Sequence, residues 1–505
     1  MSKLYIFGIG GTGARVLRSL TMLLASGVSL GNKIDTIVPV IIDPDTSNGD
    51  LTRTVSLMHL YRKIRQHLSF DNRPEKEGYF KVEIDDMNTN FRLHLNNVAN
   101  MKFADYIAYN RFTNQGQADS NQALLSLLFS DKNLACPLDV GFKGNPNMGS
   151  IVLNDPKNTE SMISLLQHFQ SDDQIFIVSS IFGGTGAAGY PIIVKNIRNA
   201  ARNTQINNRG DLRDARIGAL TVLPYFNVQQ DDNSPISRGD FISKTKSALF
   251  YYHDNLTGLR QNGVDLPLSK INACYYLGDQ VPSNPYFNDP GGNGQRNDAH
   301  LVEYVGALSV LDFRGIPDDQ LQTLDGNAQN PIYKEFGLAY DKQTLTLKDF
   351  GVQTRALVNR QLAKFHLAYM YITNQLRQDI GRGYTQDKPE LSNAFLSTSF
   401  YNTLTSDFYV SYRQWLRELR QNQRSFVPFN LTTDKLSDCL NDIAPKTGFL
   451  KSTIDYKSVL AALNKASQQA MKTQKYGTDR TALKLLDLLD ETLDKLLDEK
   501  FVGEV

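Results

Sequence analysis

Six residues near the N-terminus have the composition of a phosphate-binding loop. The segment Gly8-Ile-Gly-Gly-Thr-Gly13 follows a short apolar run and precedes leucines at helical spacing. Glycines let backbone N–H groups approach a phosphate closely, and a helix N-terminus adds about half a positive charge. The same residues fit the GxGxxG fingerprint of dinucleotide-binding proteins, in which Asp43, at the end of the next strand, would hold a ribose. This loop indicates an anion site and leaves the ligand open.

A second glycine-rich segment, Phe182-Gly-Gly-Thr-Gly-Ala-Ala-Gly189, directly follows the apolar run 174–181 and precedes a helical pattern. We therefore expect a second anion-binding helix N-terminus, at which the Thr185 hydroxyl can donate a hydrogen bond. A dinucleotide site needs one such loop, whereas two loops on one sheet can hold a triphosphate from both sides. The chain contains no GxxxxGK[ST] motif, so a Walker-type loop is not supported.

A third segment, Gly141-Phe-Lys-Gly-Asn-Pro-Asn-Met-Gly149, precedes a helical pattern around residues 158–170. Its Asn-Pro pair and flanking glycines are typical of a tight loop with exposed amides. Taken by itself, this segment predicts an ordinary turn.

An alternation of strands and helices in the first half of the chain must position these loops. Runs of apolar, β-branched or aromatic residues predict strands at 4–9, 37–43, 174–179, 216–223 and 271–277. Such alternation predicts a mostly parallel sheet covered on both faces. Pro39, within the second run, indicates an edge or a bulge. Residues 46–140 show no regular repeat, and we interpret them as an insertion that is helical in part.

The second half of the chain reads as mainly helical. Helical patterns cover 352–380 and 400–424, and the tail 481–501 carries leucines at helical spacing between Asp, Glu and Lys. That amphipathic tail must bury its leucines, and we expect it to do so on its own domain. The predicted domains are 1–315, which binds nucleotide and contains the 46–140 insertion, and 316–505, which is mainly helical.

Bulk composition limits the classes of function. A chain of 505 residues is too long for one core. Lys and Arg number 54 against 53 Asp and Glu, a net charge of +1 that gives no signal for nucleic acid. The three cysteines are far apart and suit a reducing compartment. With no apolar stretch of about 18 residues, no membrane span is predicted, and the expected location is the cytoplasm.

In their order and local context, these loops resemble those of the tubulin/FtsZ superfamily, and the chain is most similar in type to a bacterial tubulin-like protein. The resemblance covers roughly residues 1–315 with the insertion set aside. The matching positions are Gly8, Gly10, Gly11, Thr12 and Gly13 after the first strand; Asp43 and Asp45 after the second; Gly144, Asn145 and Gly149 in the NPxxG loop; Gly183, Gly184, Thr185 and Gly186 in the GGTGxG signature, which has one extra residue before Gly189; and Pro224 and Asn227, where the family contacts the ribose.

This resemblance implies a Rossmann-like, GTP-binding domain of tubulin type, in which the three loops hold the phosphates of GTP or GDP together with Mg²⁺. Asp43 or Asp45 would act on that ion through water, or on the ribose. Residues 297–313 match the family's central helix, which carries the guanine-reading residue, and the candidates for that role are Asn297, Asp298 and Glu303.

The loop after the central helix reads Arg314-Gly-Ile-Pro-Asp-Asp319. It keeps two carboxylates, Asp318 and Asp319, but departs from the family's NxDxxD/E spacing. In the family this loop orients the attacking water at a neighbouring subunit's nucleotide. The resemblance therefore implies a weak GTPase that depends on self-association.

Two alternatives stay open at this point. A non-polymerising nucleotide-binding subunit of a multiprotein bacterial system would dock other proteins through its helical C-terminal half, without turnover. A NAD-dependent oxidoreductase would use the first glycine loop and Asp43. The oxidoreductase alternative leaves the second glycine loop unexplained, and the chain shows no catalytic His or Tyr-Lys arrangement at a matching strand end.

Overall fold

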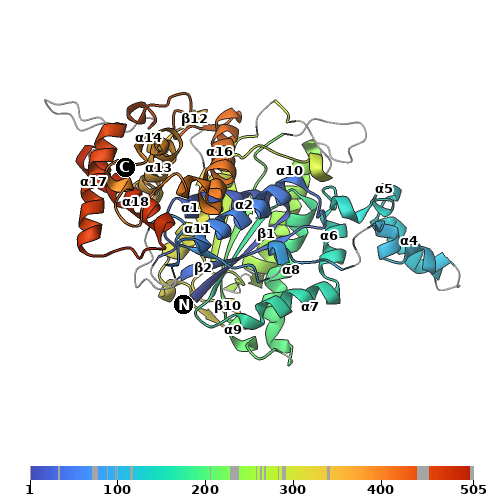
Figure 1. The fold of residues 1–505 in the computed structure, drawn as a ribbon. Coiled ribbons are helices and arrows are strands. Elements are labelled where there is room, and N and C mark those ends of the chain that lie inside the picture. The colour runs from blue at the N-terminus through green and yellow to red at the C-terminus, as the bar shows by residue number, and fades with distance from the viewer. Residues whose placement is uncertain are drawn as a thin grey trace.

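The chain folds around one parallel sheet (Figure 1). The computed structural model describes residues 2–31, 34–70, 78–87, 89–96, 98, 100–113, 118–204, 206–227, 238–257, 259–261, 264–266, 269–281, 284–286, 292–337, 342–440 and 454–500. In spatial order the strands are β11 (Ile332–Gly337), β8 (Ala273–Gly278), β5 (Arg216–Val222), β4 (Gln174–Ser180), β1 (Ser2–Ile9), β2 (Ile34–Ile42) and β3 (Glu83–Ile84). The predicted mixed α/β fold with a parallel sheet is confirmed, and its topology is compatible with a Rossmann-like fold.

The strand order reverses once, between β1 and β4. The chain lays down β1, β2 and β3 in one direction, returns to place β4 on the other side of β1, and continues outward through β5, β8 and β11. In open α/β sheets, ligands bind outside the carboxyl ends of the strands at such a reversal. The first two glycine loops follow the two strands that flank it.

The central strands are apolar because both of their faces are covered. Leu4 to Phe7 and Ile175 to Val178 are fully buried, which explains why these runs do not alternate with polar residues. Pro39 pairs with Ile6 on one side of β2, while β3 pairs only with Thr36 and Ile37. Pro39 therefore lies between the β3 pairing and an isolated parallel bridge of Ile41 with Arg92, in a gap where its missing N–H removes no ladder hydrogen bond on that side.

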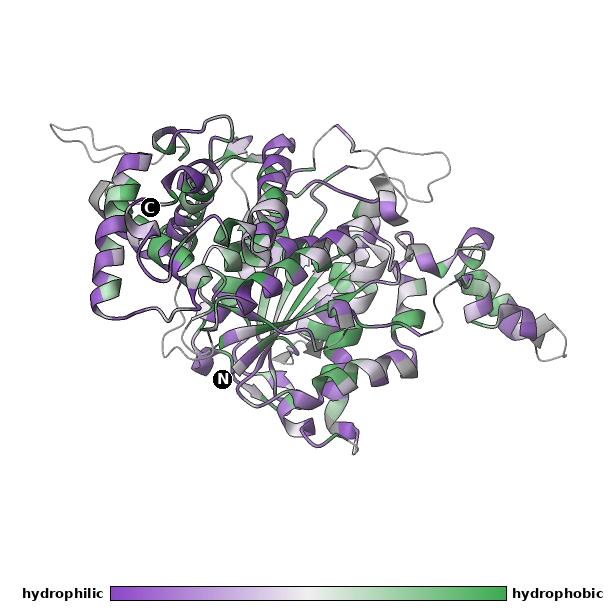
Figure 2. Ribbon diagram, in the orientation of Figure 1, coloured by the Kyte–Doolittle hydropathy of each residue, from purple (hydrophilic) through white to green (hydrophobic). Residues whose placement is uncertain are grey.

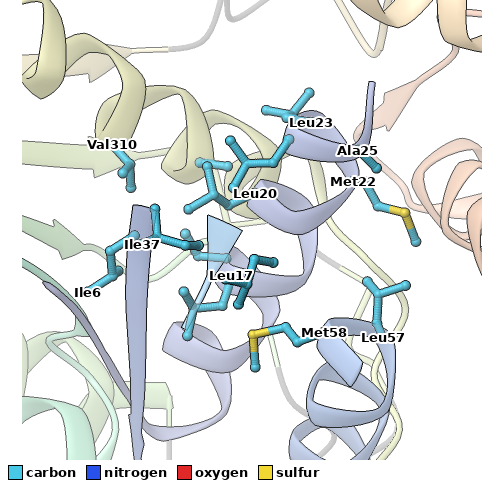
Figure 3. Packing of buried hydrophobic residues seen from close by; sticks show 14 of the residues in the cluster. Ile6, Leu17, Leu20, Met22, Leu23, Ala25, Ile37, Leu57, Met58 and Val310 are labelled. Carbon is cyan, nitrogen blue, oxygen red and sulfur yellow. The ribbon is translucent and has the colours of Figure 1, made fainter. Parts of the chain in front are cut away.

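Helices cover both faces of the sheet (Figure 1). One face carries α1 (Gly10–Ala25), α2 (Gly49–Gln66) and α11 (Leu301–Gly315); the other carries α6 (Pro146–Leu153), α7 (Pro156–Leu165), α8 (Gly184–Asn199) and α9 (Arg209–Arg213). Figure 3 shows Leu17 and Leu20 of α1 between Ile6 and Ile37 of the sheet and Leu57 and Met58 of α2. Helix α1 ends in a Schellman motif, in which Gly27 has a φ of +90°.

Part of the segment 46–140 belongs to the sheet domain. Helix α2 packs against α1, and β3 is the edge strand of the sheet, so neither is an insertion. Hydrophobic periodicity missed β3 because it has only two residues. Helices α4 (Ala118–Leu128) and α5 (Asp131–Leu134), by contrast, extend away from the body of the molecule (Figure 1). The sheet also continues past residue 315, since β11 pairs with β8.

The C-terminal half is mainly helical, as predicted. Its longer helices are α13 (Arg360–Asn374), α16 (Tyr409–Gln421), α17 (Tyr456–Lys472) and α18 (Thr481–Lys500). The α18 leucines are buried against α13 and α17, so the tail packs on its own chain as expected. Figure 2 shows hydrophobic residues along the strands and hydrophilic ones on the outer faces of the helices. None of the described helices is long and apolar enough to cross a membrane.

Lys484 of α18 anchors the loop that precedes α15 (Ser399–Asn402). This lysine is 1% exposed, and its Nζ donates hydrogen bonds to the backbone oxygens of Tyr384, Asp387 and Pro389 at 2.9, 2.5 and 3.0 Å. Burial lowers the pKa of Lys484 to about 8, which leaves the ammonium charged at pH 7. Three carbonyl groups thus depend on one buried cation.

We predict that Lys484→Met lowers the free energy of unfolding by about 3 kcal/mol, because three acceptors lose a charged donor. Urea denaturation monitored by circular dichroism measures this change. Lys495→Met is the control, because Lys495 is exposed and forms a surface ion pair with Glu491; it should change stability by less than about 0.5 kcal/mol. Equal effects of the two substitutions would contradict the anchoring role.

Candidate functional site

The three predicted loops meet at the strand-order reversal. Gly10 has a φ of +72°, and a Cβ built on it would lie 3.7 Å from the Cβ of Thr185. A Cβ on Gly184 would lie 3.0 Å from the backbone N of Asn145, and one on Gly149 would lie 2.9 Å from the oxygen of Gly184. The structure therefore brings loops 8–13, 144–149 and 183–186 together, although Gly144 lies 131 positions after Gly13.

Three helix N-termini converge at these loops. Among the described residues, the N-caps of α1, α6 and α8 (Ile9, Asn145 and Gly183) accept no side-chain hydrogen bond from the helix, and the first turn of each helix contains no acidic residue. The N–H groups of a first turn have no partner within their helix. Together with three aligned helix dipoles, they make this corner electropositive and suited to an anion.

A lysine that the sequence did not single out lies beside the same corner. Lys244 of α10 (Arg238–Tyr252) is half-buried, and its Nζ donates a hydrogen bond to the Gly144 oxygen at 3.0 Å. Helix α10 has almost no amphipathic pattern, so the sequence contained no signal that would orient this residue. Its cation adds to the positive potential of the three helix ends.

The glycines of these loops serve different purposes. Gly13 packs on Gly8 of β1, where a Cβ would come within 2.5 Å of the Gly8 carbonyl carbon. Gly184 lies against residues 142–145, so a larger side chain there would displace the neighbouring loop. At Gly10 the positive φ favours glycine. A Cβ there would not clash, because it would lie at ordinary van der Waals distance from Thr185 and Gly186. Several of the glycines are thus required for close packing, whatever the ligand.

Next to this corner lies a set of charges whose signs alternate; all are buried except Arg53, which is partly exposed. Glu303 pairs with Arg15, Arg15 with Asp50 (2.8 Å), Asp50 with Arg53 (2.6 Å), Arg53 with Glu418 (2.9 Å) and Glu418 with Arg18 (2.6 Å). We call these six residues the charge chain. Burial acts to raise the pKa of Glu418, but Arg18 and Arg53 outweigh it and hold that pKa below its usual value.

The charge chain engages two of the three candidate guanine readers. The Glu303 carboxylate accepts hydrogen bonds from Arg15, from the Tyr225 hydroxyl and from the backbone N of His300. The Asn297 side chain donates to Asp50 at 2.7 Å. Asp298, the third candidate, is exposed. Sequence position alone could not show that Glu303 caps its own helix.

The carboxylates after β2 are also held by the protein. Asp45 is 2% exposed and accepts hydrogen bonds from the N–H and hydroxyl of Ser47 and from the Gly292 N–H. Asp43 accepts one from the Asp45 N–H, and burial, aided by the Asp45 charge, raises the pKa of Asp43 to about 7. Among the described residues, no group of three or more His, Cys, Asp or Glu side chains could hold a metal ion.

On the opposite side of the glycine loops, the segment after β5 contributes aromatic rings. Pro224 and Asn227 are half-buried there, and the Asn227 oxygen accepts a hydrogen bond from the Tyr286 N–H. Between them, Tyr225 and Phe226 contact Phe182, the residue before the second glycine loop. This segment therefore adjoins the second glycine loop, and the sequence alone assigned no role to its aromatic residues.

Asp318 and Asp319 lie at the opposite end of the sheet, where the strands begin. Asp318 pairs with Arg216 at 2.8 Å, and Arg216 is the first residue of β5. A strand of seven residues, such as β4, is about 20 Å long, and this length separates the start of the strands from their carboxyl ends, where the glycine loops lie. Within one chain, these carboxylates therefore do not reach the glycine loops.

Comparisons with known proteins add little to this description. No family model matches the chain, and no curated protein matches it. Among solved structures, the chain is similar to CetZ from Methanosaeta thermophila strain DSM 6194, with 13% sequence identity and a TM-score of 0.25. The match covers 55% of this chain and 46% of that one, less than half of its length. The class of protein is therefore defined by the sheet: a mixed α/β protein with seven parallel strands.

His300 links the site to the pH dependence of stability. Its Nδ1 accepts a hydrogen bond from the Val302 N–H and so caps α11. Burial, with Arg15 and Arg424 nearby, lowers the pKa of His300 to about 3. Between pH 6.5 and 3 the unfolded chain binds a proton at this residue that the folded chain does not, so stability falls as the pH falls.

We predict that His300→Asn reduces this acid-side loss, because asparagine also caps helices but does not titrate. The difference in slope between wild type and variant should approach 1.4 kcal/mol per pH unit between about pH 4 and 6. Urea denaturation at several pH values measures the slope, and the exposed His94→Asn is the control. Parallel pH profiles for wild type and His300→Asn would contradict the assignment.

Proposed function

We propose that this chain is a nucleotide-binding protein of tubulin type that holds GTP or GDP on its three glycine loops. The observation that carries the proposal is the convergence of three uncapped helix N-termini at the strand-order reversal. Two other helices with described caps, α2 and α11, also start near the carboxyl ends of the strands, and both carry their own caps and first-turn carboxylates. The three that lack both are those that follow the glycine loops.

The residues present fit a polyphosphate. Unpaired backbone amides in the first turns of α1, α6 and α8 would hold the phosphate oxygens, the Thr185 hydroxyl would donate a hydrogen bond, and Lys244 would offset negative charge. Bound Mg²⁺ would supply further neutralisation of the phosphate charge. The pairing of loops after both β1 and β4 favours a triphosphate over a dinucleotide, which would occupy the first loop alone.

One contact favours a second candidate function, a nucleotide-binding subunit that does not hydrolyse GTP. The Asp318 carboxylate is already paired with Arg216 of its own chain. A carboxylate that orients water at a neighbouring subunit would have to give up that pair. Phosphate release measured at several protein concentrations distinguishes self-associating turnover from binding without hydrolysis.

We predict that GTP binds to the purified protein and that NAD(H) does not, as measured by isothermal titration calorimetry. Thr185→Val should weaken GTP binding roughly 10-fold or more, because one hydrogen bond to a charged ligand is lost. Thr405→Val, in a C-terminal helix, is the matched control. Tight binding of NAD(H) without guanine nucleotide would end the proposal. Gly184→Val, by contrast, would displace residues 142–145 and so disturb the packing of the loops as well as any binding.

For turnover, we expect the double substitution Asp318→Ala and Asp319→Ala to leave GTP affinity intact, since neither residue reaches the site in its own chain. Phosphate release at high protein concentration should fall by roughly 10²- to 10⁴-fold, as for loss of a water-positioning group. Wild-type activity should rise more than linearly with protein concentration. Activity that is linear and unaffected by the substitutions would exclude a shared site; no hydrolysis at any concentration would favour the non-hydrolysing subunit.

A further inference from the structure

Three aromatic side chains form a corner beside the start of α8. The ring centroids of Phe182 and Phe226 are 5.3 Å apart, those of Tyr225 and Phe226 are 4.9 Å apart, and both pairs are edge-to-face. Phe182 directly precedes Gly183, the N-cap of α8. We call Phe182, Tyr225 and Phe226 the aromatic corner. It adjoins one of the three helix ends at which the phosphates are proposed to bind.

The aromatic corner is held from behind by the charge chain. The Tyr225 hydroxyl donates to Glu303 at 2.7 Å and accepts from Arg15 at 3.1 Å. The Tyr225 ring also lies 4.8 Å from the His300 ring. Tyr225 is 3% exposed and Phe182 is 7% exposed, whereas Phe226 is half-buried and keeps part of its surface accessible. Two fixed rings thus support a third that is partly open to solvent.

A partly exposed aromatic ring next to an anion site suits a ligand that combines phosphates with a planar group. A nucleobase stacks on an aromatic side chain because every base has a π face. Two of the three candidates for recognising a base edge are already engaged, Glu303 by Arg15, Tyr225 and the His300 N–H, and Asn297 by Asp50. The described residues therefore favour contact with the face of the base over readout of its edge.

Resting on the proposed function, we infer that Phe226 stacks against the nucleobase, with Phe182 and Tyr225 as its support. This arrangement makes Phe226 a specificity-determining residue for nucleotides over inorganic polyphosphate. Stacking on Phe226 should contribute similarly to the affinity for guanine and adenine nucleotides, since both bases present a purine face.

Isothermal titration calorimetry with GTP, ATP and inorganic tripolyphosphate, on wild type and on Phe226→Ala, tests the inference. We expect Phe226→Ala to weaken GTP and ATP binding by roughly 10- to 100-fold each and to change tripolyphosphate binding less than about twofold. Phe226→Trp should retain nucleotide affinity. The matched control is Phe336→Ala, because Phe336 is 38% exposed on β11, at the far edge of the sheet. Thermal melts of each variant confirm that it is folded.

Each other outcome overturns the inference in a distinguishable way. Unchanged GTP affinity in folded Phe226→Ala would show that the ring only packs against Phe182. An equal loss for all three ligands would mean that Phe226 supports the loops and does not contact the base. If wild type binds tripolyphosphate as tightly as GTP, the base has no subsite, although the phosphate site stands. If wild type binds none of the three ligands, the proposed function itself fails.

Discussion

Buried charges of alternating sign connect the parts of this molecule that differ most in sequence position. Glu303 and Asp50 flank Arg15, while Arg53 and Glu418 continue the charge chain to Arg18. The three carboxylates are 1% exposed or less, and three cations balance them. Removing one member of such a set typically costs about 3–5 kcal/mol, because a buried partner is left uncompensated. The helices α1, α2, α11 and α16 are therefore held in one arrangement.

This arrangement determines which helix ends remain available to a ligand. Asp50 and Glu303 are acidic residues in the first turns of α2 and α11, so those ends are already neutralised within the protein. The ends of α1, α6 and α8 receive no such carboxylate. Among these five helix ends, those without a first-turn carboxylate are thus the three at which the glycine loops meet.

The C-terminal helices are an integral part of the molecule as a result. Glu418 of α16 binds Arg18 of α1 and Arg53 of α2, and it also accepts a hydrogen bond from the Ala299 N–H just before α11. Trp415, one turn earlier, donates to the Ser19 hydroxyl. Helix α1 thus begins at the candidate phosphate site and contacts the C-terminal half on its outer side. A domain boundary drawn at residue 315 divides the sequence, but these contacts cross it.

The sequence by itself determined the strands, the long helices and the three loops, because each has a local signal. Continuous apolar runs mark buried parallel strands, leucines at helical spacing mark the tail, and glycines mark sharp turns after strands. The approach of residues 10 and 184 to one another also followed, since each follows a parallel strand and the carboxyl ends of such strands lie at one end of the sheet. Residue 145 follows no strand, and only the tertiary structure places it beside them. No local signal existed for β3, whose two residues are too few for periodicity, or for β11, which was read as part of the helical half.

Only the tertiary structure decided what each polar side chain does. Asp45, Asn297 and Glu303 looked available for a ligand in the sequence, yet the fold places them against Gly292, Asp50 and Arg15. Lys244 and Phe226 carried no motif, yet they lie beside the loops. The physical reason is that a side chain's hydrogen bonds and ion pairs depend on partners that are up to 400 residues away in the chain, as between Arg18 and Glu418. Residue types and spacing specify backbone elements, whereas the pairing of buried charges exists only once those elements have packed.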